Sequence, residues 1–198
     1  ANGLRITATG SIGTLTNTST GTIAGTTYGI DNQAPLTSLT NAGSIIGNTA
    51  AIRTTATLST LNNSGTISSV GVGISNSGTL GDVTNSGTIA GGIDAIANSG
   101  TINSLGNSGT ISGGAGGIDN TGSIGSLTNS GALAGANDAL VTSGRIESLS
   151  NSGTIGGAGS ANGLRITATG SIGTLTNTST GTIAGTTYGI DNQAPLTR

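Results

Sequence analysis

The chain has 198 residues with 38 Gly, a formal net charge of −2, and no Phe, Trp, Met, Cys or His. Without Cys or His it lacks the usual parts of disulfide bridges, thiolate metal sites and nucleophilic dyads. Five Arg and no Lys cannot form the basic stripe that nucleic acid requires, and no run approaches the ~18 apolar residues of a membrane span. We therefore expect no nucleic-acid partner and no membrane-spanning segment.

The beginning of the chain returns unchanged near its end. Residues 1–37 and 161–197 are identical, so the sequence starts again at position 161. Residues 1–160 are therefore interpreted as one long repeat unit, and residues 161–198 as the start of the next copy. The whole range 1–198 is expected to form a single elongated domain within a longer array.

A shorter, 22-residue repeat runs inside the long one and is marked by four columns of aliphatic residues. The columns are Ile23, Ile45, Ile67, Ile89, Ile111, Leu133 and Ile155; Ile30, Ile52, Ile74, Ile96, Ile118 and Leu140; Leu36, Leu58, Leu80, Ile102, Ile124 and Ile146; and Leu39, Leu61, Val83, Leu105, Leu127 and Leu149. The spacing slips by two at 17–21 and by four around 156–163. Seven units and these slips account for the length of the long repeat.

Each unit carries the phrase Asn-Ser-Gly-Thr-Ile or a close variant, as at residues 85–89 and 107–111. Period-two alternation points Ile, Gly and Asn inward, and Ser and Thr outward. Gly is expected to let the backbone approach the axis at a corner, and Asn, which tolerates the left-handed region, to bond its own turn. Stacked Asn amides can form hydrogen-bonded ladders at Asn41, Asn63, Asn85, Asn107, Asn129 and Asn151, and at Asn32, Asn76, Asn98 and Asn120.

A 22-residue unit with four inward aliphatic residues cannot bury itself alone, and its composition is poor in helix formers. The pattern predicts an all-β fold, a parallel β-solenoid (β-helix) with 22-residue coils and about nine coils. Strand-crossover chirality favours a right-handed coil. At ~4.8 Å per coil, the rod would be ~40 Å long.

The acidic residues form no recognisable catalytic motif. Three of them share a column with Arg53: Asp31, Asp119 and Asp191. Asp31 and Arg53 are predicted to form a solvated ion pair of little energetic weight. Asp94 and Asp138 would lie two coils, or about 10 Å, apart, near the upper limit for an inverting glycosidase, but without an aromatic platform for a sugar. We predict that the chain is not an enzyme and has no catalytic, cofactor-binding or metal-binding residues.

The phrases at 85–89 and 107–111, together with Gly117, Ile118, Asp119 and Asn120, resemble the passenger repeats of bacterial autotransporter and filamentous-haemagglutinin-type adhesins. The likeness covers nearly the whole chain and consists of low-complexity phrases. It implies a secreted β-solenoid on the outside of a Gram-negative bacterium, with adhesion, biofilm or surface-fibre roles and no active site to carry over.

The leading hypothesis is an extracellular structural rod at the bacterial cell surface. Its repeats would continue covalently, or separate copies would associate end to end. Host or neighbouring cell surfaces are further candidate partners.

Two other functions compete with this hypothesis. An ice-binding β-solenoid is the alternative, because outward hydroxyl pairs would recur at the coil spacing: Ser64 with Thr66, Ser86 with Thr88, and Ser108 with Thr110. A carbohydrate-active solenoid enzyme would need a cleft with convergent acids and aromatic residues. The sequence offers only Tyr28 and Tyr188 as aromatic residues.

Overall fold

The computed structural model describes residues 1–195, and its regular elements across that range are all strands. They form three parallel sheets, named A, B and C. Sheet A contains β1 (Leu4–Ile6), β4 (Tyr28–Asn32), β7 (Ala50–Thr54), β10 (Val72–Asn76), β13 (Asp94–Asn98), β16 (Gly116–Asn120), β19 (Asp138–Thr142), β22 (Asn162–Ile166) and β25 (Tyr188–Asn192). Sheet B contains β2 (Ile12–Asn17), β5 (Leu36–Asn41), β8 (Thr57–Asn63), β11 (Thr79–Asn85), β14 (Thr101–Asn107), β17 (Ser123–Asn129), β20 (Arg145–Asn151) and β23 (Ser171–Asn177). Sheet C contains β3 (Thr22–Gly25), β6 (Ser44–Gly47), β9 (Thr66–Ser69), β12 (Thr88–Gly91), β15 (Thr110–Gly113), β18 (Ala132–Gly135), β21 (Thr154–Gly156) and β24 (Thr182–Ala184).

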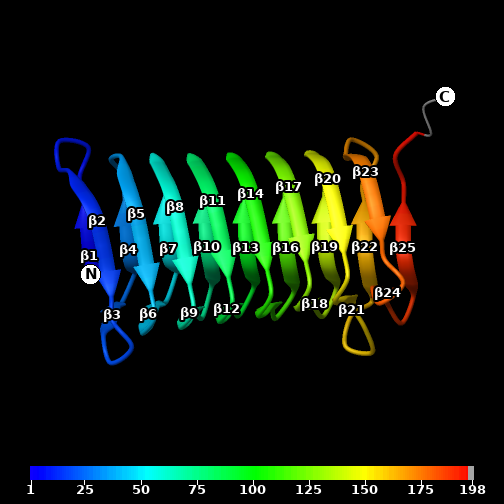
Figure 1. Cartoon of the computed structure of the whole chain (residues 1–198), viewed down its shortest axis with the longest axis horizontal. Coiled ribbons are helices and arrows are strands. Elements are labelled where there is room, and N and C mark those ends of the chain that lie inside the picture. Colours follow the sequence, from blue (N-terminus) through cyan, green and yellow to red (C-terminus); the bar gives the residue numbers. More distant parts are fainter. Residues whose placement is uncertain (196–198) are drawn as a thin grey trace.

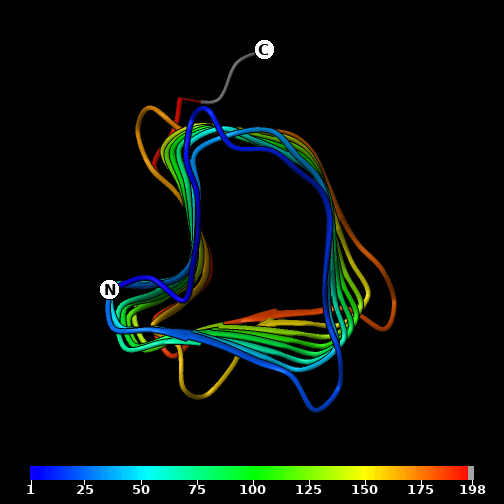
Figure 2. The same ribbon diagram turned by 90° about the vertical axis from the view of Figure 1, so that its left-hand side faces the viewer.

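Each turn of the solenoid takes one strand from each sheet, so hydrogen-bonded neighbours are three strands apart along the chain. Figure 1 shows the strands of successive coils side by side along the rod, and Figure 2 shows the three walls around a common interior. Seen from the N-terminal end in Figure 2, the chain turns clockwise as it recedes, so the coil is right-handed. The predicted parallel β-solenoid of about nine coils with a 22-residue repeat is confirmed.

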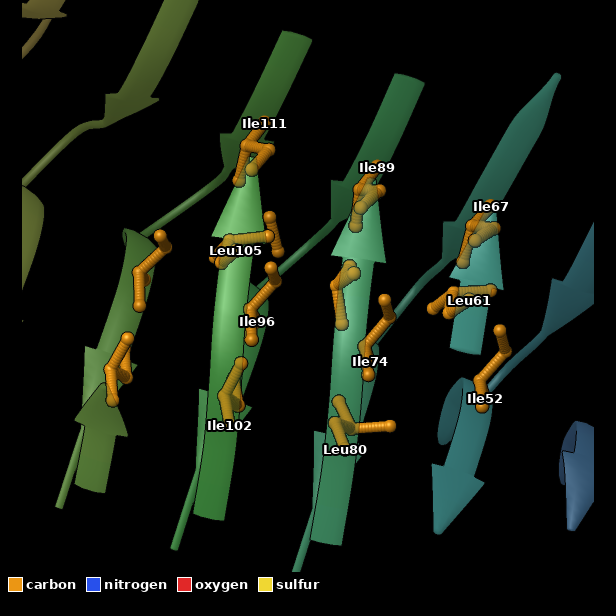
Figure 3. Packing of buried hydrophobic residues seen from close by; sticks show 14 of the residues in the cluster. Ile52, Leu61, Ile67, Ile74, Leu80, Ile89, Ile96, Ile102, Leu105 and Ile111 are labelled. Atoms are coloured by element: carbon orange, nitrogen blue, oxygen red, sulfur yellow. The ribbon is translucent and has the colours of Figure 1, made fainter. Parts of the chain in front are cut away.

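The four aliphatic columns form one continuous core. Sheet A contributes the column of Ile52, sheet B those of Leu58 and Leu61, and sheet C that of Ile45. All four residues are at most 1% exposed, which confirms the inward positions predicted for this coil. Figure 3 shows like residues of neighbouring coils stacked in rows. Because each coil covers the next, medium-sized aliphatic side chains are enough to fill the interior.

The first predicted asparagine ladder runs up the corner between sheets B and C. Each Nδ2 donates to the Oδ1 of the Asn in the next coil, at 2.7 to 2.8 Å, from Asn17 through Asn151 to Asn177. The same Nδ2 also donates to a backbone carbonyl of the next coil, as Asn63 does to Thr88 at 3.1 Å. These buried amides therefore have partners in the neighbouring coil and fix the register there.

The second ladder, at the corner between sheets A and B, is shorter than the first. Asn76 donates to Asn98 at 2.6 Å, and Asn98 donates to Asn120 at 2.7 Å. A threonine hydroxyl replaces the amide acceptor at either end of the series: Asn32 donates to Thr54, and Asn120 donates to Thr142, each at 3.0 Å.

Glycine in the repeated phrase is required for a different reason from the one expected. A Cβ on Gly87 would lie 2.1 Å from the carbonyl oxygen of Gly65 in the preceding coil, and Gly109 stands in the same relation to Gly87. Within residues 1–195 only Gly156 and Gly157 have positive φ, at 84° and 118°. Glycine therefore permits close contact between coils, and the asparagines of these corners do not use the left-handed region.

Departures from the 22-residue spacing form loops at the corners. Leu140 pairs with Leu164 at i+24, whereas Ile146 pairs with Ile172 at i+26. The four extra residues expected around 156–163 are therefore divided between two corners. Loop 157–161 takes two of them and loop 167–170 takes the other two. With loop 178–181, all three corners of this coil carry a loop, and Figure 2 shows such loops projecting beyond the stacked corners.

We expect Ile89→Asp to lower the free energy of unfolding by more than about 4 kcal/mol, because Ile89 is fully buried and an Asp would have no partner there. The control is Asp82→Ala, which removes an exposed carboxylate bonded to the Ser104 hydroxyl and should change stability by less than about 0.5 kcal/mol. Urea unfolding followed by circular dichroism measures both. Equal stability of the two variants would contradict the inward and outward assignment.

Gly87→Ala is expected to destabilise the protein by about 1 to 3 kcal/mol, because the new Cβ meets the backbone of the preceding coil. Gly106→Ala is the matched control, since a Cβ there comes no closer than 3.9 Å to Val83 O. It should be neutral or stabilise by about 0.5 kcal/mol. Thermal melts of the two variants test the contrast, and a neutral Gly87→Ala would show that coil contact does not require glycine.

Candidate functional site

Charged residues gather on the outer surface of sheet A. The chain has five Arg and seven acidic residues, and eight of these lie on the strands of this sheet. The eight are Arg5, Asp31, Arg53, Asp94, Asp119, Asp138, Arg165 and Asp191. We name this set the charged face. Sheet B carries Asp82, Arg145 and Glu147, and the described strands of sheet C carry no charge.

Asp31 is a buried carboxylate near one end of the charged face. Its side chain is 3% exposed and lies between two guanidinium groups, with Arg53 Nη1 3.4 Å from Oδ1 and Arg5 Nε 3.6 Å from Oδ2. Asn2 Nδ2 and Gln33 Nε2 donate to Oδ2 at 3.1 and 2.9 Å. Asp31 and Arg53 do form the predicted ion pair, but the prediction that it is solvated is wrong. Residues of three coils cover the Asp31 carboxylate.

At two places in sheet A, the first residue of one strand contacts the fourth residue of the next strand in that sheet. Tyr28 begins β4, and its ring centroid lies 5.1 Å from the guanidinium carbon of Arg53, the fourth residue of β7. Asp138 begins β19, and its Oδ2 accepts hydrogen bonds from Arg165, the fourth residue of β22, at 2.6 Å from Nη2 and 3.0 Å from Nε. Asn162 Nδ2 donates to Asp138 Oδ1 at 2.8 Å. Asp138, only 4% exposed, thus has both oxygens bonded by the following coil.

Asp94 and Asp119 occupy the same two positions of successive sheet A strands, but both are acids. Asp94 begins β13, and Asp119 is the fourth residue of β16. Burial raises the pKa of Asp94, the charge of Asp119 raises it further, and a backbone hydrogen bond from Gly116 partly opposes the rise. Burial also raises the pKa of Asp119; Arg165 opposes that rise and Asp138 adds to it. Neighbouring coils therefore repel each other at the middle of the charged face.

Sequence columns alone do not reveal these contacts. The columns group Asp119 with Arg53, whereas the charge of Asp119 acts on Asp94, which belongs to another column. The sequence signal that could have identified them is the i to i+25 spacing, from Tyr28 to Arg53 and from Asp94 to Asp119.

The structure places Asp94 and Asp138 in one column, two coils apart as predicted, with Gly116 between them. Within residues 1–195, no three or more acidic, His or Cys residues are arranged to hold a metal ion. A surface depression of about 430 Å³ lies beside loop 167–170, and none of its lining residues is acidic. The interpretation of the chain as a non-enzyme stays a prediction.

The hydroxyl pairs predicted for ice binding are in register but do not share a flat surface. Ser64 lies in the corner between sheets B and C, whereas Thr66 begins β9 in sheet C. The Ser64 hydroxyl donates to the carbonyl of Asn41 in the preceding coil at 3.4 Å, and the serines of the next coils do the same. Each pair therefore spans a bend, and its serine already has a protein acceptor.

A flatter set of polar groups covers the outer face of sheet B. One row of paired positions holds Thr14, Ser38, Thr60, Asp82, Ser104, Ser126, Ser148 and Thr174. A second row, two positions further along each strand, holds Thr16, Thr40, Asn62, Thr84, Gly106, Thr128, Ser150 and Thr176. We name these two rows the hydroxyl face. In the sequence, the two rows correspond to the positions three residues and one residue before each asparagine of the ladder between sheets B and C. Polar residues recur at both positions.

We expect Asp94→Arg to raise the free energy of unfolding at neutral pH by about 0.5 to 1 kcal/mol, because it converts the repulsion between Asp94 and Asp119 into an attraction. In the wild type, the pKa values of Asp94 and Asp119 are raised above 3.8, so the folded state binds more protons than the unfolded state. Their contribution to stability is therefore lost as the pH rises from about 4 through the raised pKa values. Urea melts of both proteins between about pH 4 and pH 7 measure the difference.

The control is Asp94→Asn, which removes the repulsion without adding a pair and should gain less stability than Asp94→Arg. Both variants should show a weaker decline with rising pH than the wild type. Identical pH profiles for all three proteins would show that the two carboxylates do not interact.

Comparison of the chain with protein-family models, with curated proteins and with solved structures found no match. Among the residues that the structure describes, there is no helix with the length and apolar character needed to cross a membrane.

Proposed function

We propose that the chain is a structural segment of a bacterial surface adhesin or filament, forming an extracellular rod built from 160-residue copies. The observation that carries the proposal is the passage from one copy to the next. Strands β19, β20 and β21 of the first copy pair in parallel with β22, β23 and β24 of the second, so all three sheets cross the boundary. A copy therefore ends on a coil that fits the beginning of the next, and any number of copies can stack into one rod.

The core and the asparagine ladder both continue across this boundary. The asparagine ladder crosses it through Asn151, which donates to Asn177 at 2.8 Å. The core crosses it as well, because Leu140 pairs with Leu164 and both are fully buried. A junction with a continuous core and ladder transmits stiffness along the rod, which suits a stalk or fibre.

The location and the biological role come from the resemblance of residues 85–89 and 107–111 to adhesin passenger repeats. On that basis the rod lies at the outside of a bacterial cell and serves adhesion, biofilm formation or a surface appendage. Host or neighbouring cell surfaces are the partners that such a rod would meet.

Arrays of one, two and three 160-residue copies test the rod. Seven coils at ~4.8 Å each predict that every added copy lengthens the particle by ~34 Å at constant cross-section. Small-angle X-ray scattering and electron microscopy measure both dimensions. A radius of gyration that grows as it would for a compact globule would overturn the proposal.

Antibody labelling tests the location separately. An antibody raised against residues 1–160 should label intact cells of the bacterium that encodes the chain as strongly as permeabilised cells. Labelling that appears only after permeabilisation would contradict the surface role and leave the rod shape untouched.

Ice binding is a second candidate, and the hydroxyl face is the observation that favours it. Its two rows lie on one sheet and repeat at the coil spacing, which an ordered water lattice could match. Thermal hysteresis measured for the wild type and for Thr128→Leu, which changes the middle of one row, tests this role. No hysteresis in the wild type would remove the candidate.

A further inference from the structure

The outer surface of sheet C and the corners on either side of it form a wall without charge. We name this surface, over strands β6, β9, β12, β15 and β18, the uncharged face. Its segments contain no charged residue: 42–49, 64–71, 86–93, 108–115 and 130–137. Loops 18–21 and 157–161 project on this side of the rod, before β6 and after β18 (Figures 1 and 2). A flat partner therefore has the five coils between the loops available to it.

Exposed apolar side chains gather on one half of the uncharged face. Within residues 1–160, the large hydrophobic residues that are exposed are Ile46 at 40%, Val70 at 75% and Ile93 at 53%. Ile46 lies on β6, whereas Val70 and Ile93 lie in the corners that follow β9 and β12. Ile46 and Val70 also line a surface depression of about 210 Å³. Apolar patches of this kind mark interaction surfaces.

The other half of the uncharged face holds small residues at the same positions. Following the column of Ile46 through the paired strands leads to Ala134 four coils later. The position of Val70 is taken by Gly114 two coils later. A second copy, turned end over end about β12, would therefore place its Ala134 against Ile46 and its Gly114 against Val70. Large residues would meet small ones, as dense packing requires, and no charges would be opposed.

We propose that the uncharged face binds the same face of a second copy of this chain, in an antiparallel pair whose two-fold axis crosses β12. Five strands ~4.8 Å apart and about six residues across at ~3.3 Å each give roughly 500 Å² per partner, or about 1,000 Å² in total. That area is at the lower limit of specific interfaces, so the pair is weak and reversible. The proposal goes beyond the rod proposed above, because it joins rods side by side. Coils stacked before or after this chain leave the face open.

Single-cysteine variants of the whole chain test the arrangement, because the chain itself has no Cys. Ile46→Cys and Ala134→Cys lie on facing coils of the proposed pair, whereas two copies of either variant would hold their cysteines about four coils, or ~19 Å, apart. A short dimaleimide should therefore link the mixture at least about tenfold more efficiently than either variant alone. The matched control is Ser38→Cys with Ser126→Cys, in the same two coils on the outer face of sheet B. That mixture should give no more dimer than its single variants.

Charge placed at the two-fold axis tests the same contact. Ala90 lies on the outer side of β12, and Ala90→Asp in both partners should lower the cross-linking yield of the Ile46→Cys and Ala134→Cys mixture at least about tenfold. Ala90→Asp in one partner and Ala90→Arg in the other should restore the yield, and this recovery excludes unfolding as the cause of the loss. Thr84→Asp, exposed on sheet B of the same coil, should leave the yield unchanged.

Three results would overturn the proposal. They are a mixture that cross-links no better than its single variants, an equal loss with Thr84→Asp, and no recovery in the Asp and Arg combination. Each of them leaves the rod standing, because the length of a linked array does not depend on contacts between the sides of rods.

Discussion

Parallel hydrogen bonding between coils places each residue directly over its equivalent in the preceding coil, and the other features of the structure depend on this constraint. A side chain that bonds well to a copy of itself is favoured at every level, as Asn63 and Asn85 show. A group that cannot lie close to its own copy is excluded at every level, as the near contact of Gly87 with Gly65 shows. The low-complexity sequence is thus the chemical result of stacking, since few residue types satisfy both conditions.

Charge is the property that fits this arrangement worst, because like charges in one column repel. The chain confines most of its charges to sheet A and alternates their signs where the carboxylate is buried, with Asp31 between Arg5 and Arg53. Asp138 and Arg165 follow the same rule across the copy boundary. Since the coils are otherwise nearly equivalent, these pairs distinguish one coil from another. A coil stacked out of order would leave a buried carboxylate without its guanidinium group, which is costly.

Spacing in the sequence is sufficient to predict the solenoid, its four aliphatic columns and the longer asparagine ladder, because each depends only on equivalent positions of successive repeats. It is not sufficient where three or more segments meet. The burial of Asp31 requires Asn2, Gln33 and two arginines from neighbouring coils. The effect of the Asp119 charge on Asp94 joins two different columns, and Ser64 lies in a corner, outside strand β9 of sheet C. Corner geometry is a property of backbone packing, and aliphatic spacing does not encode it.

The tips of the loops at 157–161, 167–170 and 178–181 project beyond the stacked corners, and the loops change the length of one coil while the columns above and below keep their register. Foreign peptides inserted at these three points would therefore leave the core and the ladders undisturbed. In an array, the insertion points recur once per copy, ~34 Å apart along the axis and on three sides of the rod. The number of copies would then set the valency of whatever is displayed, with a separation fixed by the solenoid and not by a flexible linker.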